Sequence, residues 1–156
     1  MKKNRLEILK EEMDLKSKDI AKILNVAEST YSEWEHNKIP IPTRRIIELA
    51  DFYKINIDYM LKLTNIKIKI NEPTIINLEK IGQKLLIIRK ELDYSLRELG
   101  NVLNCSFSAL ANYERGENLI ISETLISLSS ISNHSIDWIL GRAEKDILAE
   151  NKKWDL

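Results

Sequence analysis

Apolar side chains recur at helical spacing along the chain, and the clearest case lies in its second half. Leu99 and Leu103 stand four residues apart, and Leu110 and Tyr113 stand three apart, so each pair falls on one face of a helix. Gly100 lies between the first two and leaves room for a second helix to cross closely. The pattern predicts two short helices that pack against each other.

The residues around these two helices predict where each one begins and ends. Ser95 and Glu98 form an S-x-x-E pair of the kind that caps a helix start, and Ser106 can cap the second helix. Asn104 suits a left-handed turn position, and Gly116 suits a left-handed helix end. A helix, a tight turn and a second helix form the arrangement whose second helix contacts bases in the major groove of DNA.

The same pattern occurs earlier in the chain. A shift of 79 residues lays residues 6–64 on 85–143 without a gap, and 14 of the 59 aligned positions are identical. A repeat of this length indicates that one folded unit occurs twice. The identical pairs include Leu6/Leu85, Asp14/Asp93, Leu24/Leu103, Asn25/Asn104, Glu35/Glu114, Leu49/Leu128, Asp58/Asp137 and Leu61/Leu140.

Each copy is predicted to form five helices, which makes the chain all-α with two tandem helical domains. The first three helices of the copies are expected at residues 3–13, 17–24 and 28–35, and at 78–92, 96–103 and 107–114. Thr43 or Ser122 is expected to cap the fourth helix, and Asn56 or Ser135 to start the fifth. Asp58 and Asp137, near the start of the fifth helix, are expected to act as capping and dipole residues.

A repeated charge spacing predicts a structural ion pair in each copy. Lys10 precedes Glu35 by 25 residues, and Arg89 precedes Glu114 by the same number. A buried or half-buried carboxylate needs a cationic partner. We therefore expect these pairs to tie the first helix to the end of the third.

The stretch between the copies, residues 65–77, breaks the helical pattern. Isoleucine and lysine alternate over residues 66–70, which is a strand signal, and Pro73 ends it. Two interpretations remain open: an extended linker, or a short edge strand that pairs with its counterpart in a second subunit. The predicted division is a domain at 1–64, the linker at 65–77, a domain at 78–143 and a tail at 144–156. The charged tail is typical of a helical extension that packs on a neighbour or frays.

The two copies resemble the phage-repressor type of helix-turn-helix, the Cro/repressor or XRE family. The matching strings are Ile81-Gly, Ser95-Leu-Arg-Glu-Leu-Gly, Tyr113-Glu-Arg-Gly and Ile136-Asp-Trp-Ile-Leu-Gly-Arg in the second copy, and Asp19-Ile-Ala-Lys-Ile-Leu-Asn-Val, Trp34-Glu and Asn56-Ile-Asp-Tyr-Met-Leu in the first. The resemblance implies two lambda-repressor-like bundles of five helices. It also implies sequence-specific binding to double-stranded DNA, usually as a homodimer.

In this family a polar residue at the start of the second helix contacts the DNA backbone, and exposed residues of the third helix contact base edges. The second-helix positions here are Ser17 and Leu96, where the family commonly has glutamine. The third-helix positions are Glu28, Ser29, Ser32 and Glu33 in the first copy, and Phe107, Ser108, Ala111 and Asn112 in the second. Asn112 suits base contact because Asn can bond adenine at two atoms.

The surroundings of the two motifs differ in charge. The first motif has basic neighbours suited to phosphate contact: Lys16, Lys18, Lys38, Arg44 and Arg45. Near the second motif the cations are Arg97 and Arg115, and Leu96 and Phe107 give its exposed face an apolar character. The leading hypothesis is a transcriptional regulator, most simply a repressor that occludes promoter DNA. The alternative is a protein-interaction adaptor or dimerisation module that kept the fold but lost DNA binding in one or both copies. It would bind its partner through Leu96, Phe107 and the Glu-rich third helix of the first copy.

Composition restricts the other functions. Lys+Arg and Asp+Glu balance at 24 each, so the chain has no overall charge that would attract nucleic acid. Cys105 is the single cysteine, and His36 and His134 have no companions at metal-ligand spacing, so we expect neither disulfide, metal nor cofactor. No catalytic constellation is present, and we do not expect an enzyme. With no membrane-length apolar run and no hydrophobic signal core, we expect a cytoplasmic protein without membrane contact.

Overall fold

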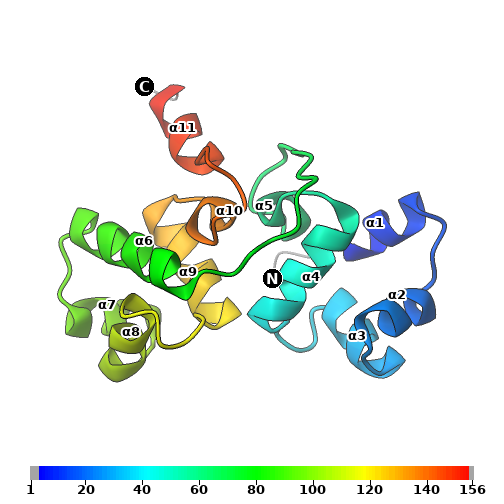
Figure 1. Cartoon of the computed structure of the whole chain (residues 1–156), viewed down its shortest axis with the longest axis horizontal. Coiled ribbons are helices and arrows are strands. Elements are labelled where there is room, and N and C mark those ends of the chain that lie inside the picture. Colours follow the sequence, from blue (N-terminus) through cyan, green and yellow to red (C-terminus); the bar gives the residue numbers. More distant parts are fainter. Residues whose placement is uncertain (1–3, 155–156) are drawn as a thin grey trace. The chain divides into compact units, whose positions relative to one another are not determined.

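The computed structural model describes residues 4–154, with side chains described for residues 4–150. The chain divides into two compact units, Met1–Pro73 (unit 1) and Thr74–Leu156 (unit 2). Unit 1 contains α1 (Leu6–Glu12), α2 (Ser17–Leu24), α3 (Glu28–Glu35), α4 (Thr43–Tyr53) and α5 (Ile57–Met60). Unit 2 contains α6 (Leu78–Glu91), α7 (Leu96–Leu103), α8 (Phe107–Glu114), α9 (Ser122–Ser132), α10 (Ile136–Ile139) and α11 (Ile147–Trp154) (Figure 1). Regular structure between residues 4 and 154 is helical, which confirms the predicted all-α fold.

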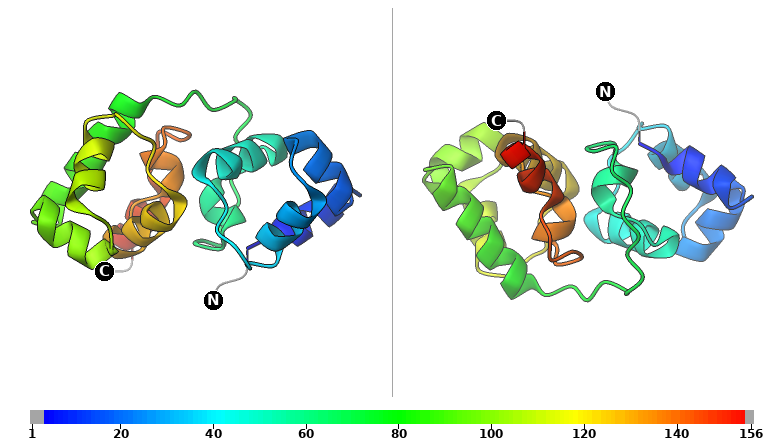
Figure 2. Two further views of the ribbon diagram at one scale, coloured as in Figure 1. Left: turned by 90° about the horizontal axis from the view of Figure 1, so that it is seen from below. Right: turned by 90° about the horizontal axis from the view of Figure 1, so that it is seen from above.

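Both helix-turn-helix motifs form with the helix bounds that the sequence predicted, and in each unit the two helices lie side by side (Figure 2). Asn25 and Asn104 end the first helix of the motif in the left-handed conformation, with φ of 55° and 53°. The Ser95 hydroxyl accepts from the Glu98 N–H at 3.1 Å, and the Glu98 carboxylate accepts from the Ser95 N–H at 3.0 Å. The predicted capping box therefore starts α7.

The start of the fourth helix differs from the prediction in both copies. Thr43 and Ser122 are the first helical residues of α4 and α9, and Pro42 and Ile121 occupy the N-cap positions. Both hydroxyl residues are only 5% exposed. The expectation that they cap these helices is wrong, because the chain enters each helix one residue earlier and turns both side chains inward.

Equivalent positions build the two cores. Among the fully buried side chains, Ile20, Leu49 and Ile57 of unit 1 correspond through the 79-residue shift to Leu99, Leu128 and Ile136 of unit 2. Each of these six is at most 2% exposed. The repeat in the sequence is therefore a repeat of core positions, and each unit has its own apolar centre.

Gly82 allows α6 to approach the end of α8 closely. A Cβ atom at this position would lie 2.4 Å from the Glu114 carbonyl oxygen and 2.7 Å from that of Tyr113. Gly82→Ala is expected to lower the free energy of unfolding of unit 2 by about 1–3 kcal/mol, because two backbone segments must separate. Chemical denaturation measures this loss, and Gln83→Ala on the exposed side of the same helix is the matched control. An equal effect of the two substitutions would contradict the close contact.

Residues 66–70 are extended, as their alternation predicted, and pair with residues 54–56 of the same unit. The Asn56 N–H donates to the Ile68 carbonyl at 3.1 Å, and the Ile68 N–H donates to the Asn56 side-chain oxygen at 2.8 Å. The Asn56 amide nitrogen also donates to the Ile66 carbonyl at 3.0 Å. A single antiparallel bridge joins Ile55 and Lys69. The first half of the predicted linker thus packs on unit 1, and the division between units falls after Pro73.

His134 links the segment before α11 to the rest of unit 2. Its Nδ1 lies 2.6 Å from the Asp146 carboxylate and its Nε2 lies 2.7 Å from that of Glu91, while its ring stacks on Trp138 at 5.0 Å. Asp146 also accepts from the Ala149 N–H at 3.2 Å, at the first turn of α11. Burial alone would lower the pKa of His134, but the hydrogen bonds and charges of the two carboxylates raise it above the ordinary value.

The attachment of α11 is therefore expected to weaken as the pH rises. Because the folded-state pKa of His134 is raised, the protonated ring stabilises unit 2 fully below a pH of about 6.5, and this contribution is lost as the pH rises through the folded-state pKa. Hydrogen exchange at residues 147–150, corrected for intrinsic rates, should accelerate over that range. His134→Gln should remove this pH dependence and His36→Gln should keep it. The same profile in all three proteins would contradict this role of His134.

Candidate nucleic-acid interface

An ion pair connects the first helix of each unit to the end of the third. Lys10 Nζ lies 2.8 Å from Glu35 Oε1, and Arg89 Nε and Nη2 lie 2.7 and 3.0 Å from the two carboxylate oxygens of Glu114. None of the four side chains is more than 14% exposed. These pairs join the residues that share the spacing of 25, and they hold α3 and α8 at a defined rotation.

A second repeated contact was not predicted from the sequence. The Arg5 guanidinium lies 4.0 Å over the Tyr59 ring and donates to the Thr64 carbonyl at 2.9 Å. In unit 2 the Lys84 amine lies 4.8 Å over the Trp138 ring and donates to the Trp138 carbonyl, and burial lowers the pKa of Lys84. A signal was present, because Arg5/Lys84 and Tyr59/Trp138 are both equivalent under the 79-residue shift.

The contacts of α3 determine which of its faces meets solvent. Tyr31, Trp34 and Glu35 are buried, and burial raises the pKa of Tyr31, so its hydroxyl stays protonated. The opposite face carries the predicted base-contact residues, three of them exposed and the last half-buried: Glu28, Ser29, Glu33 and Ser32. His36 Nδ1 lies 2.7 Å from the Ser32 carbonyl oxygen. This places a polar, solvent-facing surface on α3.

Four of the five predicted phosphate contacts near α3 have exposed side chains: Lys16, Lys18, Lys38 and Arg44. Within residues 4–150, none of the four takes part in an ion pair. Arg45 differs, because its Nη1 donates to the Leu24 carbonyl at 2.7 Å and to Glu48 at 2.9 Å. Arg45 therefore covers the end of α2, while the other four cations point their charge at solvent.

Ser17 is also engaged inside unit 1. Its hydroxyl lies 3.1 Å from Lys10 Nζ, which donates to it, and donates to Glu35 at 3.4 Å. The side chain is half-buried beside the ion pair. Ser17 thus supports the junction of α1 and α3 in this structure, whereas the sequence suggested a phosphate donor.

The corresponding surface of unit 2 carries both apolar and polar side chains, and its two arginines contact other residues of the same surface. Phe107 is 43% exposed, and the Arg97 guanidinium lies 5.0 Å over its ring. Arg115 pairs with Glu117 at 3.1 Å and donates to the Asn112 side-chain oxygen. Leu96 is half-buried, whereas Ser108 is exposed. Both predicted cations of this motif therefore have a partner within the surface.

The two surfaces differ most in charge at equivalent positions. Lys16, Lys18, Lys38 and Arg44 correspond through the 79-residue shift to Ser95, Arg97, Glu117 and Glu123. Four positive charges in unit 1 thus become one positive and two negative charges in unit 2. Among the described residues, a group of four exposed cations without ion pairs is thus a feature of unit 1 that the equivalent positions of unit 2 do not repeat.

Other candidate groups take structural positions. Asp137, expected to act as a capping and dipole residue, lies in the first turn of α10, is 1% exposed and also pairs with buried Arg142, which donates to Thr74 at 2.9 Å. Cys105 is half-buried and its thiol lies 3.6 Å from the Ser106 carbonyl. Among the described residues, no group of three or more His, Cys, Asp or Glu is placed to hold a metal ion. No helix in this part of the chain has the length and apolarity needed to cross a membrane.

Each unit contains a helix, a tight turn and a second helix with an exposed face, which is the arrangement that defines helix-turn-helix proteins. The sequence profile of the helix-turn-helix family matches residues 6–60 and again residues 85–139, which together are more than half of the chain. The chain belongs to this family, in its phage-repressor-like (XRE) group.

Two individual proteins show what the chain is similar to. The HTH-type transcriptional regulator ImmR of Bacillus subtilis (strain 168) is 33% identical over 76 residues, which are 49% of this chain and 58% of the relative. The chain thus spans little more than half the length of this relative. The clp gene regulator ClgR of Corynebacterium glutamicum, a solved structure, is 27% identical, with 49% of this chain and 82% of that chain covered and a TM-score of 0.38.

Proposed function

We propose that this chain is a sequence-specific DNA-binding regulator of transcription, and that unit 1 provides its principal DNA interface. The observation that carries this proposal is the exposed polar face of α3, flanked by four exposed cations without ion pairs among the described residues. In such an interface the cations contact phosphates and hold the helix in register. The named relative, a transcriptional regulator, supports the same class of function.

The side chains on α3 suit direct contact with base edges. Ser29 and Ser32 can donate to or accept from a base, and Glu28 and Glu33 can accept from cytosine N4. Phosphates repel a nearby carboxylate, and a hydrogen bond from a base donor to the carboxylate offsets this repulsion. We therefore expect operators with cytosine at the positions that face Glu28 or Glu33.

The proposed mode of regulation is repression by a homodimer. Residues 1–64 carry 12 basic and 11 acidic residues, a net charge of +1, which predicts weak binding to arbitrary DNA. In a homodimer the two copies of unit 1 gain affinity because the second binding event is intramolecular. Two copies bound to one face of DNA would place their α3 helices about 34 Å apart, and the occupied groove would exclude other proteins.

Unit 2 favours a second binding role beside this one. Phe107 stands where unit 1 has Glu28, and its ring is 43% exposed beneath Arg97. An exposed aromatic side chain next to half-buried Leu96 suits a protein contact better than a phosphate backbone. We propose that this face contacts a second subunit while unit 1 contacts DNA.

Fluorescence anisotropy of the intact chain tests the proposed function. A labelled duplex from the region upstream of its own gene should bind at least about tenfold more tightly than a scrambled duplex, with affinity that falls steeply with salt. Sedimentation of the same sample would show whether the bound species is a dimer. Equal affinity for the two duplexes at every salt concentration would refute sequence-specific binding.

A further inference from the structure

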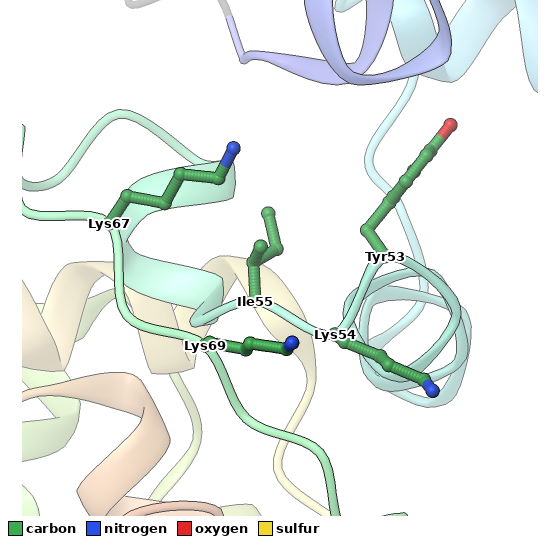
Figure 3. A pocket seen from close by; sticks show the side chains of 5 residues that line it. All are labelled: Tyr53, Lys54, Ile55, Lys67 and Lys69. Carbon is green, nitrogen blue, oxygen red and sulfur yellow. The ribbon is translucent and has the colours of Figure 1, made fainter. Parts of the chain in front are cut away.

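Unit 1 contains an open pocket at the C-terminal end of α4 (Figure 3). Its volume is about 370 Å³, and it is lined by Tyr53, Lys54, Ile55, Lys67 and Lys69. Ile55 stands between Lys67 and Tyr53, the Lys69 side chain extends beneath it, and the Lys54 amine points away (Figure 3). The pocket therefore combines an apolar floor with lysines on the segment that follows α5.

In unit 2 the residues that correspond to Lys54 and Ile55 bond to the segment that follows α10. Under the 79-residue shift, Lys54 and Ile55 correspond to Asn133 and His134, whereas Lys67 and Lys69 lie beyond the repeat, which ends at residue 64. The Asn133 amide donates to the Leu148 carbonyl at 2.7 Å, and His134 pairs with Asp146 at 2.6 Å. In unit 2 these two positions thus have partners within the chain itself. In unit 1, by contrast, Lys54 and Ile55 line a pocket together with two further lysines.

Little within the chain neutralises the lysines of the pocket. Lys67 lies 3.4 Å from Glu12, and both side chains are about half exposed, so this pair is weak and exchangeable. Lys69 has no ion pair among the described residues. Lys54 adopts the left-handed conformation with φ of 56°, where unit 2 has the more suitable Asn133. A lysine at this position has a conformational cost that an asparagine lacks.

The position of the pocket separates it from the proposed DNA interface. Arg44 lies in the first turn of α4 and Tyr53 ends that helix, so about 14 Å of helix lies between them. A volume of about 370 Å³ matches a small molecule, and a hollow with an apolar floor suits an organic group better than a rigid duplex.

We propose that this pocket binds a small organic anion, with its acidic group paired to Lys67 and Lys69 and its apolar part against Ile55 and Tyr53. The ligand carries a carboxylate or a phosphate monoester on an aliphatic or aromatic body of a few carbon atoms. The site does not depend on DNA binding, and it stands whether or not the proposed function of unit 1 is correct.

Amide chemical shifts of the full chain test the site. Hexanoate and phenyl phosphate serve as the carboxylate and phosphate probes, with hexanol and inorganic phosphate as the apolar and the charged halves alone. Shifts at residues 53–55 and 66–70 are expected with one or both organic anions, and at least about tenfold weaker binding with either half. The stronger of the two anions identifies the acidic group.

Variants make the test specific. Lys67→Gln with Lys69→Gln should weaken anion binding at least about tenfold without moving the amide signals of the core, whereas Lys22→Gln, on exposed α2 surface, should leave it unchanged. The proposal is overturned if neither anion shifts these amides, if hexanol binds equally well, or if the double variant binds like the natural chain. Shifts of these amides by duplex DNA and not by the anions would also overturn it.

Discussion

Replacing Arg89 by methionine is expected to lower the free energy of unfolding of unit 2 by about 3 kcal/mol, because Glu114 would keep a largely buried charge without its partner. Arg89 donates twice to Glu114, at 2.7 and 3.0 Å, and once to the Tyr94 carbonyl at 3.0 Å. Methionine retains the apolar stem, so the loss reports on charge more than on packing. Guanidinium unfolding measures it, with hydrogen exchange in α6 and α8 assigning the change to unit 2.

A double substitution separates the unpaired charge from the ion pair as a whole. Arg89→Met with Glu114→Leu removes both charges, and we expect it to regain at least half of the lost stability. The gain arises because no buried carboxylate then remains without a partner. A double variant as unstable as the single one would show that the pair stabilises unit 2 through its geometry and not through charge compensation.

Reversing two cations of unit 1 is expected to reduce DNA affinity by at least about tenfold. Lys16→Glu with Arg44→Glu removes two phosphate contacts and adds two repulsive charges to the surface beside α3. Each phosphate contact contributes about 0.9 to the slope of log affinity against log salt, so the slope should fall by almost two. Both side chains are exposed and without ion pairs among the described residues, so the thermal unfolding of the variant should match that of the natural chain.

Unit 2 supplies the matched control for this variant. Lys80→Glu with Lys90→Glu makes the same change in charge on the exposed surface of α6, outside the Phe107 face that is proposed to contact a second subunit. We expect DNA affinity to change by less than about threefold. A larger loss of affinity from the unit 2 variant than from the unit 1 variant would place the principal interface in unit 2 and contradict the proposal.

The features that the sequence predicts well are those that depend on local chemistry or on the repeat. Asn25 and Asn104 adopt the left-handed turn because few residues tolerate it, and the Ser95–Glu98 box forms because its partners lie three residues apart. The Lys10–Glu35 ion pair joins residues that lie 25 positions apart, yet its spacing recurs in the second copy. A repeat thus makes some distant contacts visible in one sequence.

The features that the sequence does not predict depend on how segments meet in three dimensions. The position of Ser17 in its helix predicts an exposed hydroxyl, but this hydroxyl is hydrogen-bonded to both Lys10 and Glu35. The sequence predicts Arg45 as a phosphate contact, but in the structure its guanidinium donates to the Leu24 carbonyl at the end of α2. His134 contacts Asp146 because the chain folds back on itself after α10. No residue spacing in the sequence predicts this contact.

The interface on α3 remains the central proposal, and hydrogen exchange of the intact chain with and without its upstream duplex tests it most directly. Bound DNA should slow exchange in residues 16–36 and 38–45 of unit 1, since contact with phosphates and bases excludes water from the backbone there. Residues 95–117 of unit 2 should change little. Protection confined to residues 95–117, with 16–45 unchanged, would contradict the assignment of the DNA interface to unit 1.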